Sequence, residues 1–212
     1  MLKVFLKASG YTYRRIRKRL KGKPDAEEYG LLVSQLNELI KLEKGRFLTI
    51  FYADESGFSE TPCIPYGWQP KKEPLSIPTQ SGRRCNVFGL MSRSNELHAY
   101  TSEKSIDSGF IIRAINDFVK NKVKEPSVIV LDNARVHHSK VFKDKIPEWK
   151  EQQVDIFYLP TYSPHLNLIE TFWRKCKYEW FEPQHFESWA KVLEQLDNIL
   201  KHFGSKFNIN FS

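Results

Sequence analysis

The feature that most constrains the fold is an uninterrupted run of strand-forming residues, RFLTIFYAD, at positions 46–54. Side chains alternate between the two faces of a strand. Here both alternating sets are apolar or favour β structure: Leu48, Ile50 and Tyr52 in one, and Phe47, Thr49, Phe51 and Ala53 in the other. A strand that is apolar on both faces is covered on both sides. We therefore predict a central strand, ending at Asp54, in an enclosed sheet.

The other elements predict a mixed sheet. A helix is expected over 25–44, and a proline-rich excursion over 62–78. Two strands joined by a short polar turn follow, and then helices alternate with strands. The expected ranges are strands at 84–93, 96–103, 126–134 and 152–160, and helices at 105–123, 139–150, 164–175 and 186–203. Hairpin-paired strands followed by this alternation indicate an α/β domain with helices on the faces of its sheet.

Composition excludes several classes of protein. No apolar run approaches the ~20 residues of a membrane helix, and the first apolar stretch is too short for a signal peptide. Three separated cysteines, Cys63, Cys85 and Cys176, give neither a disulfide framework nor a zinc signature. We therefore expect a cytoplasmic protein without a membrane partner.

Positive charge is concentrated near the N-terminus. Residues 1–50 carry 12 of the 33 Lys and Arg residues and 5 of the 25 Asp and Glu residues. Basic blocks favour nucleic-acid binding, although a solvated linker without a fixed partner is also compatible. We assign residues 1–45 to a basic arm and helix, and 46–212 to the main domain. The candidate nucleic-acid contacts are Arg14, Arg15, Arg17, Lys18 and Arg19, together with Lys71 and Lys72 in the proline-rich excursion.

Three acids stand where solvated carboxylates are unusual. Asp54 and Asp132 each follow a buried strand, and Glu170 is expected on an apolar helix face next to Leu166. Taken singly, the aspartates can be turn formers and the glutamate can pair with Arg174. Taken together, two adjacent strand ends and a helix packed over them would gather the three carboxylates. Such carboxylates repel one another unless cations join them.

Oxygen ligands with few histidines favour Mg²⁺ or Mn²⁺ over Zn²⁺. Two such ions ~4 Å apart would activate a water or hydroxyl and stabilise the leaving oxygen of a phosphodiester. The competing interpretation is a zinc hydrolase that uses His137 and His138, but the H-x-x-x-H spacing and a third nearby histidine are missing. We expect His137 to line the site and contact phosphate.

Three blocks resemble the catalytic blocks of DDE transposases of the Tc/mariner superfamily, in its bacterial insertion-sequence branch. They are YADESGF, VLDNARVHHS and LPTYSPHLNLIETFW, in that order. The third is the most specific, because a Tyr-Ser-Pro-x-Leu-Asn-x-Ile-Glu string is hard to produce by chance. The resemblance runs from about residue 10 to the C-terminus. Within it, GYTYRRIRKRLKGKPD is similar to the family's segment between the DNA-binding region and the catalytic domain.

The resemblance implies a ribonuclease H-like fold, an α/β mixed five-stranded sheet flanked by helices. It makes Asp54, Asp132 and Glu170 the catalytic triad and the ligands of two Mg²⁺ or Mn²⁺ ions, with Asn133 and Asn167 in supporting positions. It implies cleavage of double-stranded DNA at the ends of an insertion sequence and joining to target DNA. It further implies a homodimer, and a location in the bacterial cytoplasm at the nucleoid.

The sequence departs from the family pattern at three places. His165 stands where the family usually has Asp, and Leu168 where it usually has Pro. Family members also begin with helix-turn-helix domains, of which LKVFLKASGY alone could be a remnant. We therefore expect a catalytic domain without its specificity domain, as a truncated copy, the downstream product of a split reading frame, or a deliberately shortened chain.

Two other functions stay open at this point. One is a non-catalytic DNA-binding remnant of a transposase, in which the basic arm is the active element. The other is a ribonuclease H-like nuclease acting on RNA–DNA hybrids. The third block argues against that nuclease, because a generic enzyme has no reason to share it.

Overall fold

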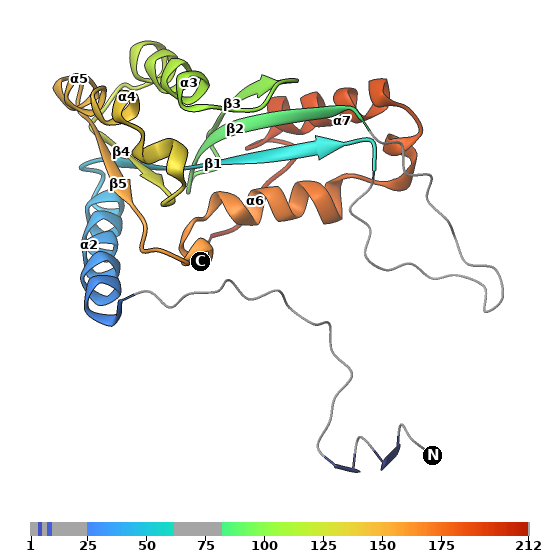
Figure 1. The fold of residues 1–212 in the computed structure, drawn as a ribbon, viewed down its shortest axis with the longest axis horizontal. Coiled ribbons are helices and arrows are strands. Elements are labelled where there is room, and N and C mark those ends of the chain that lie inside the picture. The colour runs from blue at the N-terminus through green and yellow to red at the C-terminus, as the bar shows by residue number, and fades with distance from the viewer. Residues whose placement is uncertain (1–3, 6–7, 10–24, 62–81, 212) are drawn as a thin grey trace.

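The computed structural model describes residues 4–5, 8–9, 25–61 and 82–211. Its centre is a mixed five-stranded sheet in the order β3-β2-β1-β4-β5 (Figure 1). The strands are β1 Thr49–Ser59, β2 Arg84–Ser92, β3 Leu97–Ser102, β4 Ser127–Leu131 and β5 Val154–Tyr158. The β1–β2 and β2–β3 pairs are antiparallel, and the β1–β4 and β4–β5 pairs are parallel. The predicted mixed sheet is confirmed.

β1 is the central strand, as expected, and it is buried on both faces. Ile50 and Tyr52 enter one core cluster, and Phe51 and Ala53 enter the other. Phe47 lies ahead of the strand and is exposed, unlike the prediction. The alternation of two apolar sets in one strand therefore does place a hydrophobic core on each side of the sheet.

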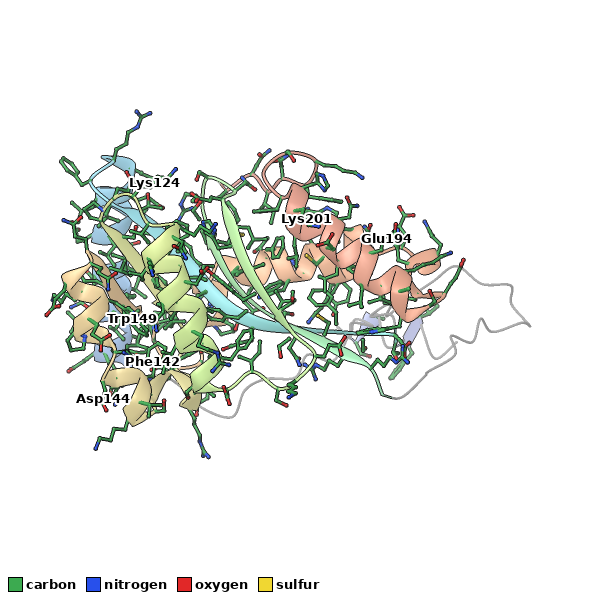
Figure 2. The ribbon with its side chains drawn as sticks, turned by 90° about the horizontal axis from the view of Figure 1, so that it is seen from above. Lys124, Phe142, Asp144, Trp149, Glu194 and Lys201 are labelled. Carbon is green, nitrogen blue, oxygen red and sulfur yellow. The ribbon has the colours of Figure 1, made fainter. Side chains whose placement is uncertain are left out.

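Helices cover both faces of the sheet. They are α2 Ala26–Lys44, α3 Ser108–Asn121, α4 Lys140–Lys143, α5 Ile146–Glu151, α6 Ile169–Lys175 and α7 Trp189–His202. The core on one side of the sheet packs α3, α4 and α5 against it. In this core the rings of Phe142 and Trp149 pack edge to face, with their centroids 5.2 Å apart (Figure 2). The core on the other side joins α6 and α7. No helix in the described ranges is long and apolar enough to cross a membrane.

α2 confirms the helix expected over 25–44. Asp25 caps it by accepting hydrogen bonds from the amides of Glu27 and Glu28. Leu36 on this helix is buried in the same core as β1. Near its end, Glu43 accepts a hydrogen bond from the Ile50 amide. The helix is therefore attached to the sheet, whereas the domain boundary at residue 45 stays a prediction.

β1 is longer than predicted. Its pairing with the parallel neighbour β4 ends at Tyr52, opposite Val130. Its pairing with the antiparallel neighbour β2 continues to Ser59. Asp54 therefore lies within the strand and not at its end, at the point where one neighbour has stopped and the other continues.

The third block also differs from the prediction. The predicted helix over 164–175 is interrupted, because Pro164–Leu166 is a 3₁₀ turn and α6 begins at Ile169. Asn167 separates the two with an extended backbone (φ −88°, ψ 104°). Its side-chain amide donates to the Ala53 carbonyl oxygen on β1 at 3.0 Å. This long-range bond fixes the break, and Leu166 consequently does not share a helix face with Glu170.

Candidate active site

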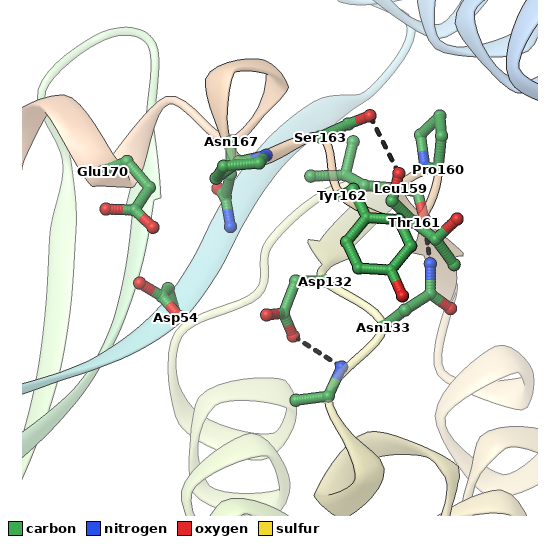
Figure 3. Close-up of a pocket in the computed structure, with 12 residues that line it drawn as sticks. Asp54, Asp132, Asn133, Leu159, Pro160, Thr161, Tyr162, Ser163, Asn167 and Glu170 are labelled. Carbon is green, nitrogen blue, oxygen red and sulfur yellow. Dashed lines mark hydrogen bonds between the residues drawn. The ribbon is translucent and has the colours of Figure 1, made fainter. Parts of the chain in front are cut away.

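The three acids predicted as a group line one pocket of about 330 Å³ (Figure 3). Asp54 comes from β1, Asp132 directly follows β4, and Glu170 lies in the first turn of α6. The loop 159–164 forms another wall of the pocket. Residues far apart in the sequence thus meet at the place where β1 and β4 separate.

Strand pairing explains the positions of the two aspartates. β1 and β4 run parallel and are joined up to the Tyr52–Val130 pair. Beyond it, β1 continues along β2 while the chain after Leu131 leaves the sheet. Asp54 and Asp132 are each two residues past this last pair, so both carboxylates lie at the opening between the strands.

Close packing of α6 explains the position of Glu170. Ile169 and Trp173 are buried on either side of it in sequence. They lie directly over Gly89 of β2, where an added Cβ would be 3.0 Å from Ile169 Cδ1 and 3.1 Å from Trp173 Cη2. Glu170 itself is exposed, because it projects from the side of the buried face toward the pocket (Figure 3). No ion pair joins it to Arg174 in the described part of the chain.

Burial and neighbouring carboxylates raise the pKa values of two of the three acids. Burial, reinforced by the charges of Glu170, Glu55 and Asp132, raises the pKa of Asp54 to about 8. Although much of the Glu170 side chain is exposed, partial desolvation of its carboxyl raises its pKa, with Lys177 opposing the effect and Asp132 adding to it. Negative charge is therefore crowded in the pocket beyond what its own residues neutralise.

His137 supports Asp132 from beneath the pocket. Its Nδ1 lies 3.0 Å from Asp132 Oδ1, and its Nε2 lies 3.2 Å from Glu55 Oε1. Burial opposes the charged imidazolium, but these two hydrogen bonds and charges outweigh burial and raise the pKa of His137 to about 10. For Asp132, burial acts upward on the pKa, and the hydrogen bonds from His137 and the Ala134 amide outweigh it and lower the pKa.

This placement disagrees with the phosphate contact predicted for His137. Its side chain is 0% exposed and both ring nitrogens face carboxylates. A phosphate cannot reach it, so its effect on the site is exerted through Asp132. Glu55, which the sequence interpretation left out, is the second partner, and its position beside Asp54 in YADESGF was the available signal.

The two supporting asparagines have different tasks. Asn133 donates from Nδ2 to the Leu159 carbonyl oxygen and accepts from His138 at 2.8 Å, which ties the end of β4 to the loop that walls the pocket. Asn167 lines the pocket and is 3% exposed. Its Oδ1 is buried and has no hydrogen-bond partner within the described residues. An orphaned buried oxygen of this kind calls for a water or a cation.

The predicted basic contacts cannot be placed in the same way. Arg14, Arg15, Arg17, Lys18 and Arg19, with Lys71 and Lys72, lie outside the described residues. Three residues that the sequence interpretation did not assign to the site do lie near the acids, since Arg174, Lys177 and Tyr178 line a hollow that also contains Glu170. Their signal was their helical spacing from that glutamate.

The donor set fits magnesium or manganese. The pocket offers three carboxylates and an unpaired amide oxygen, all hard oxygen ligands. Within residues 25–61 and 82–211, no three His, Cys, Asp or Glu side chains lie close enough together to hold one ion as they stand. Burial, together with the neighbouring carboxylates, raises the pKa of Asp54, and a divalent cation would offset both effects by stabilising the ionised carboxylate.

The fold and this pocket define an α/β domain of the ribonuclease H-like class. The family described as DDE superfamily endonuclease matches residues 49–192, which is more than half of the chain. The chain therefore belongs to the DDE superfamily endonucleases. No curated protein matches it.

Solved structures of Mos1 transposase have a similar fold. The paired-end complex with the left transposon end has a TM-score of 0.59 at 12% identity, covering 97% of this chain and 64% of that chain. The mariner Mos1 paired end complex with Mg gives 0.61 at 14%, covering 94% and 62%. The catalytic domain of Mos1 mariner transposase gives 0.50 at 11%, covering 86% and 85%. At these identities the likeness concerns the fold alone, and the chain spans less than two thirds of the first two.

Proposed function

We propose that this chain is the catalytic domain of a transposase of the Tc/mariner superfamily, in its bacterial insertion-sequence branch. In this proposal it cuts DNA strands at the ends of the element and joins them to target DNA, with Mg²⁺ or Mn²⁺ as cofactor. The observation that carries the proposal is the pocket in which Asp54, Asp132 and Glu170 meet, with no basic side chain among the described residues that line it. Family membership supports it, as do structural neighbours described as complexes with a transposon end, with Mn and with Mg.

Each residue of the pocket has a role in this proposal. Divalent cations held by Asp54, Asp132 and Glu170 would neutralise the phosphate and activate the attacking oxygen. His137 keeps Asp132 ionised and oriented through its 3.0 Å hydrogen bond. Asn167 holds the start of α6 against β1 and so sets the distance between Glu170 and Asp54.

The partners and location belong to the same proposal. Double-stranded DNA, as element ends and as target, is the expected partner, and the basic arm would hold its backbone. Two subunits are needed to bring two element ends together, which favours a homodimer. The protein would act in the bacterial cytoplasm, at the nucleoid.

A nicking assay tests the catalytic proposal. Supercoiled plasmid is incubated with the full chain in Mg²⁺, Mn²⁺ or EDTA, and nicked product is measured on a gel. We expect nicking with either metal and none in EDTA. Loss of one ligand in Asp132→Asn removes several kcal/mol of charge stabilisation, so nicking should fall ~100-fold or more. Asp155→Asn, on the exposed side of β5, is the matched control and should nick normally.

The same assay separates the alternatives. A folded protein that binds DNA but nicks none of it is the non-catalytic remnant. A protein that cleaves an RNA–DNA hybrid and spares duplex DNA is the ribonuclease H-like nuclease. Either result overturns the proposed function.

A further inference from the structure

A second hollow, of about 690 Å³, opens beside the carboxylate pocket along α6. The two share Asp54, Asn167 and Glu170 in their linings, so they form one continuous surface. We call this second hollow the α6 groove. Its remaining lining includes Arg174, Lys177 and Tyr178. A ligand that reaches the carboxylates can therefore extend into the α6 groove.

The three side chains form a row that starts at Glu170. They follow it by four, seven and eight residues, and all three line the same hollow as Glu170. α6 passes into a π-helical turn at Cys176–Trp180, a feature that is frequent at functional sites. Phe172 and Cys176 are buried, which anchors the opposite side of the helix in the core. The row is therefore held by packing and leads away from the acids.

The two cations of this row have no ion-pair partner among the described residues. In the described part of the chain, neither Arg174 nor Lys177 forms a salt bridge, whereas the neighbouring Lys175 pairs with Glu179 at 2.6 Å. Lys177 Nζ lies 5.6 Å from the centre of the Phe58 ring, which fixes its position over an aromatic face. Two positive groups thus lie next to a pocket with excess negative charge.

Tyr178 adds an aromatic face to the α6 groove. It is 50% exposed, and no hydrogen bond to its hydroxyl is found among the described residues. An exposed ring next to unpaired cations is the combination with which proteins bind single-stranded nucleic acid, because bases stack on the ring and phosphates meet the cations. Bases within an intact duplex are already stacked and cannot use such a ring.

We propose that the α6 groove binds an unpaired stretch of the substrate strand next to the phosphate to be cut. Arg174 and Lys177 contact its phosphates, and Tyr178 stacks on one of its bases. The inference rests on the proposed function for the identity of the polyanion. It adds that the DNA substrate is partly unpaired at this site.

Binding of labelled oligonucleotides by the full chain in EDTA tests the proposal. The probes are a blunt duplex and the same duplex with a single-stranded extension, and binding is measured by fluorescence anisotropy at several salt concentrations. The variants are Arg174→Gln/Lys177→Gln, Tyr178→Leu and Tyr178→Phe. The control Lys191→Gln/Lys201→Gln removes the same charge from α7, and neither lysine lines the α6 groove.

We expect wild type to bind the extended duplex more tightly than the blunt one. The α6 double variant should lose this preference and reduce the salt slope for the extended probe by ~1.4, for two single-strand phosphate contacts. Tyr178→Leu should weaken binding of the extended probe ~5- to 100-fold, while Tyr178→Phe retains it. The α7 control should keep the preference.

Two results would overturn the inference. One is equal binding of the blunt and extended probes by wild type. The other is an α6 double variant that behaves like the α7 control. Binding is measured without metal, so it is independent of cleavage. If the protein nicks plasmid but shows either of these binding results, only the inference about the α6 groove is refuted. If the protein binds the probes as expected but never nicks DNA, the proposed cleavage is refuted and the inference about the α6 groove stands.

Discussion

Replacing Asp54 by Asn should stabilise the metal-free protein, although it removes a residue of the candidate active site. The pKa of this carboxyl is 3.8 in the unfolded reference and about 8 in the folded chain, raised first by burial and then by Glu170, Glu55 and Asp132. The folded protein therefore holds a proton that the unfolded chain releases between these pH values. Stability from this group falls as pH rises through that window. Asn carries no charge and escapes the effect.

The size of the stabilisation by Asp54→Asn follows from the shift in the pKa of Asp54. Each pH unit between the two pKa values is worth ~1.4 kcal/mol, so the advantage of Asp54→Asn can grow by up to about 2.7 kcal/mol between pH 6 and pH 8. The pocket is open to water, which screens the carboxylates, so we expect about 1–2 kcal/mol. His137, whose pKa is raised to about 10, loses stability with pH in the same direction but is common to both proteins.

Urea unfolding in EDTA at pH 6, 7 and 8 measures this advantage, with Asp155→Asn as the control for removing an exposed carboxylate. In excess Mg²⁺ the order should reverse, because a cation that binds the folded wild type stabilises it, whereas the Asp54→Asn variant has lost a ligand charge. The reasoning is refuted if Asp54→Asn is no more stable than wild type at pH 8 in EDTA, or if its advantage does not grow with pH.

Two further substitutions test the supports of the pocket. His137→Gln should lower nicking ~10- to 100-fold, because Asp132 loses the hydrogen bond that orients it. The variant should also lose the stability that the charged His137 gives wild type, which is full below pH ~6.5 and disappears toward pH 10. Nicking and urea unfolding measure the two effects, with exposed His202→Gln as control, and unchanged values would contradict the role given to the hydrogen bonds of His137 with Asp132 and Glu55. Gly89→Val should cost about 1–3 kcal/mol by pushing Ile169 and Trp173 away. Gly30→Ala, which meets no atom within 4 Å, should not destabilise, and equal urea midpoints for the two would count against the close packing of α6.

The sheet could be predicted because local patterns decided it. The two apolar sets of residues 46–54 require burial on both sides, and the hairpin and later alternation leave few ways to arrange five strands. The grouping of Asp54, Asp132 and Glu170 followed from the same reasoning, since strand ends of a mixed sheet meet at one edge. Repulsion among carboxylates then indicated the chemistry of the pocket.

The remaining details depend on contacts that no local pattern carries. β1 extends beyond its predicted end because it still pairs with β2 after its pairing with β4 has ended. α6 starts late because Asn167 bonds to Ala53, 114 residues earlier. His137 is buried, and its second nitrogen contacts Glu55, 82 residues earlier in the sequence. Each of these partners is known only once the chain has folded.

Binding of Mn²⁺ to the full chain, followed by titration calorimetry, tests most directly the claim that the three acids form one metal site. We predict that wild type binds about two ions per chain, and that Asp132→Asn and Glu170→Gln each weaken or abolish this binding. Glu179→Gln, whose side chain pairs with Lys175 instead of entering the pocket, should bind as wild type does. Binding that is absent in folded wild type, or unchanged in both pocket variants, would contradict the account.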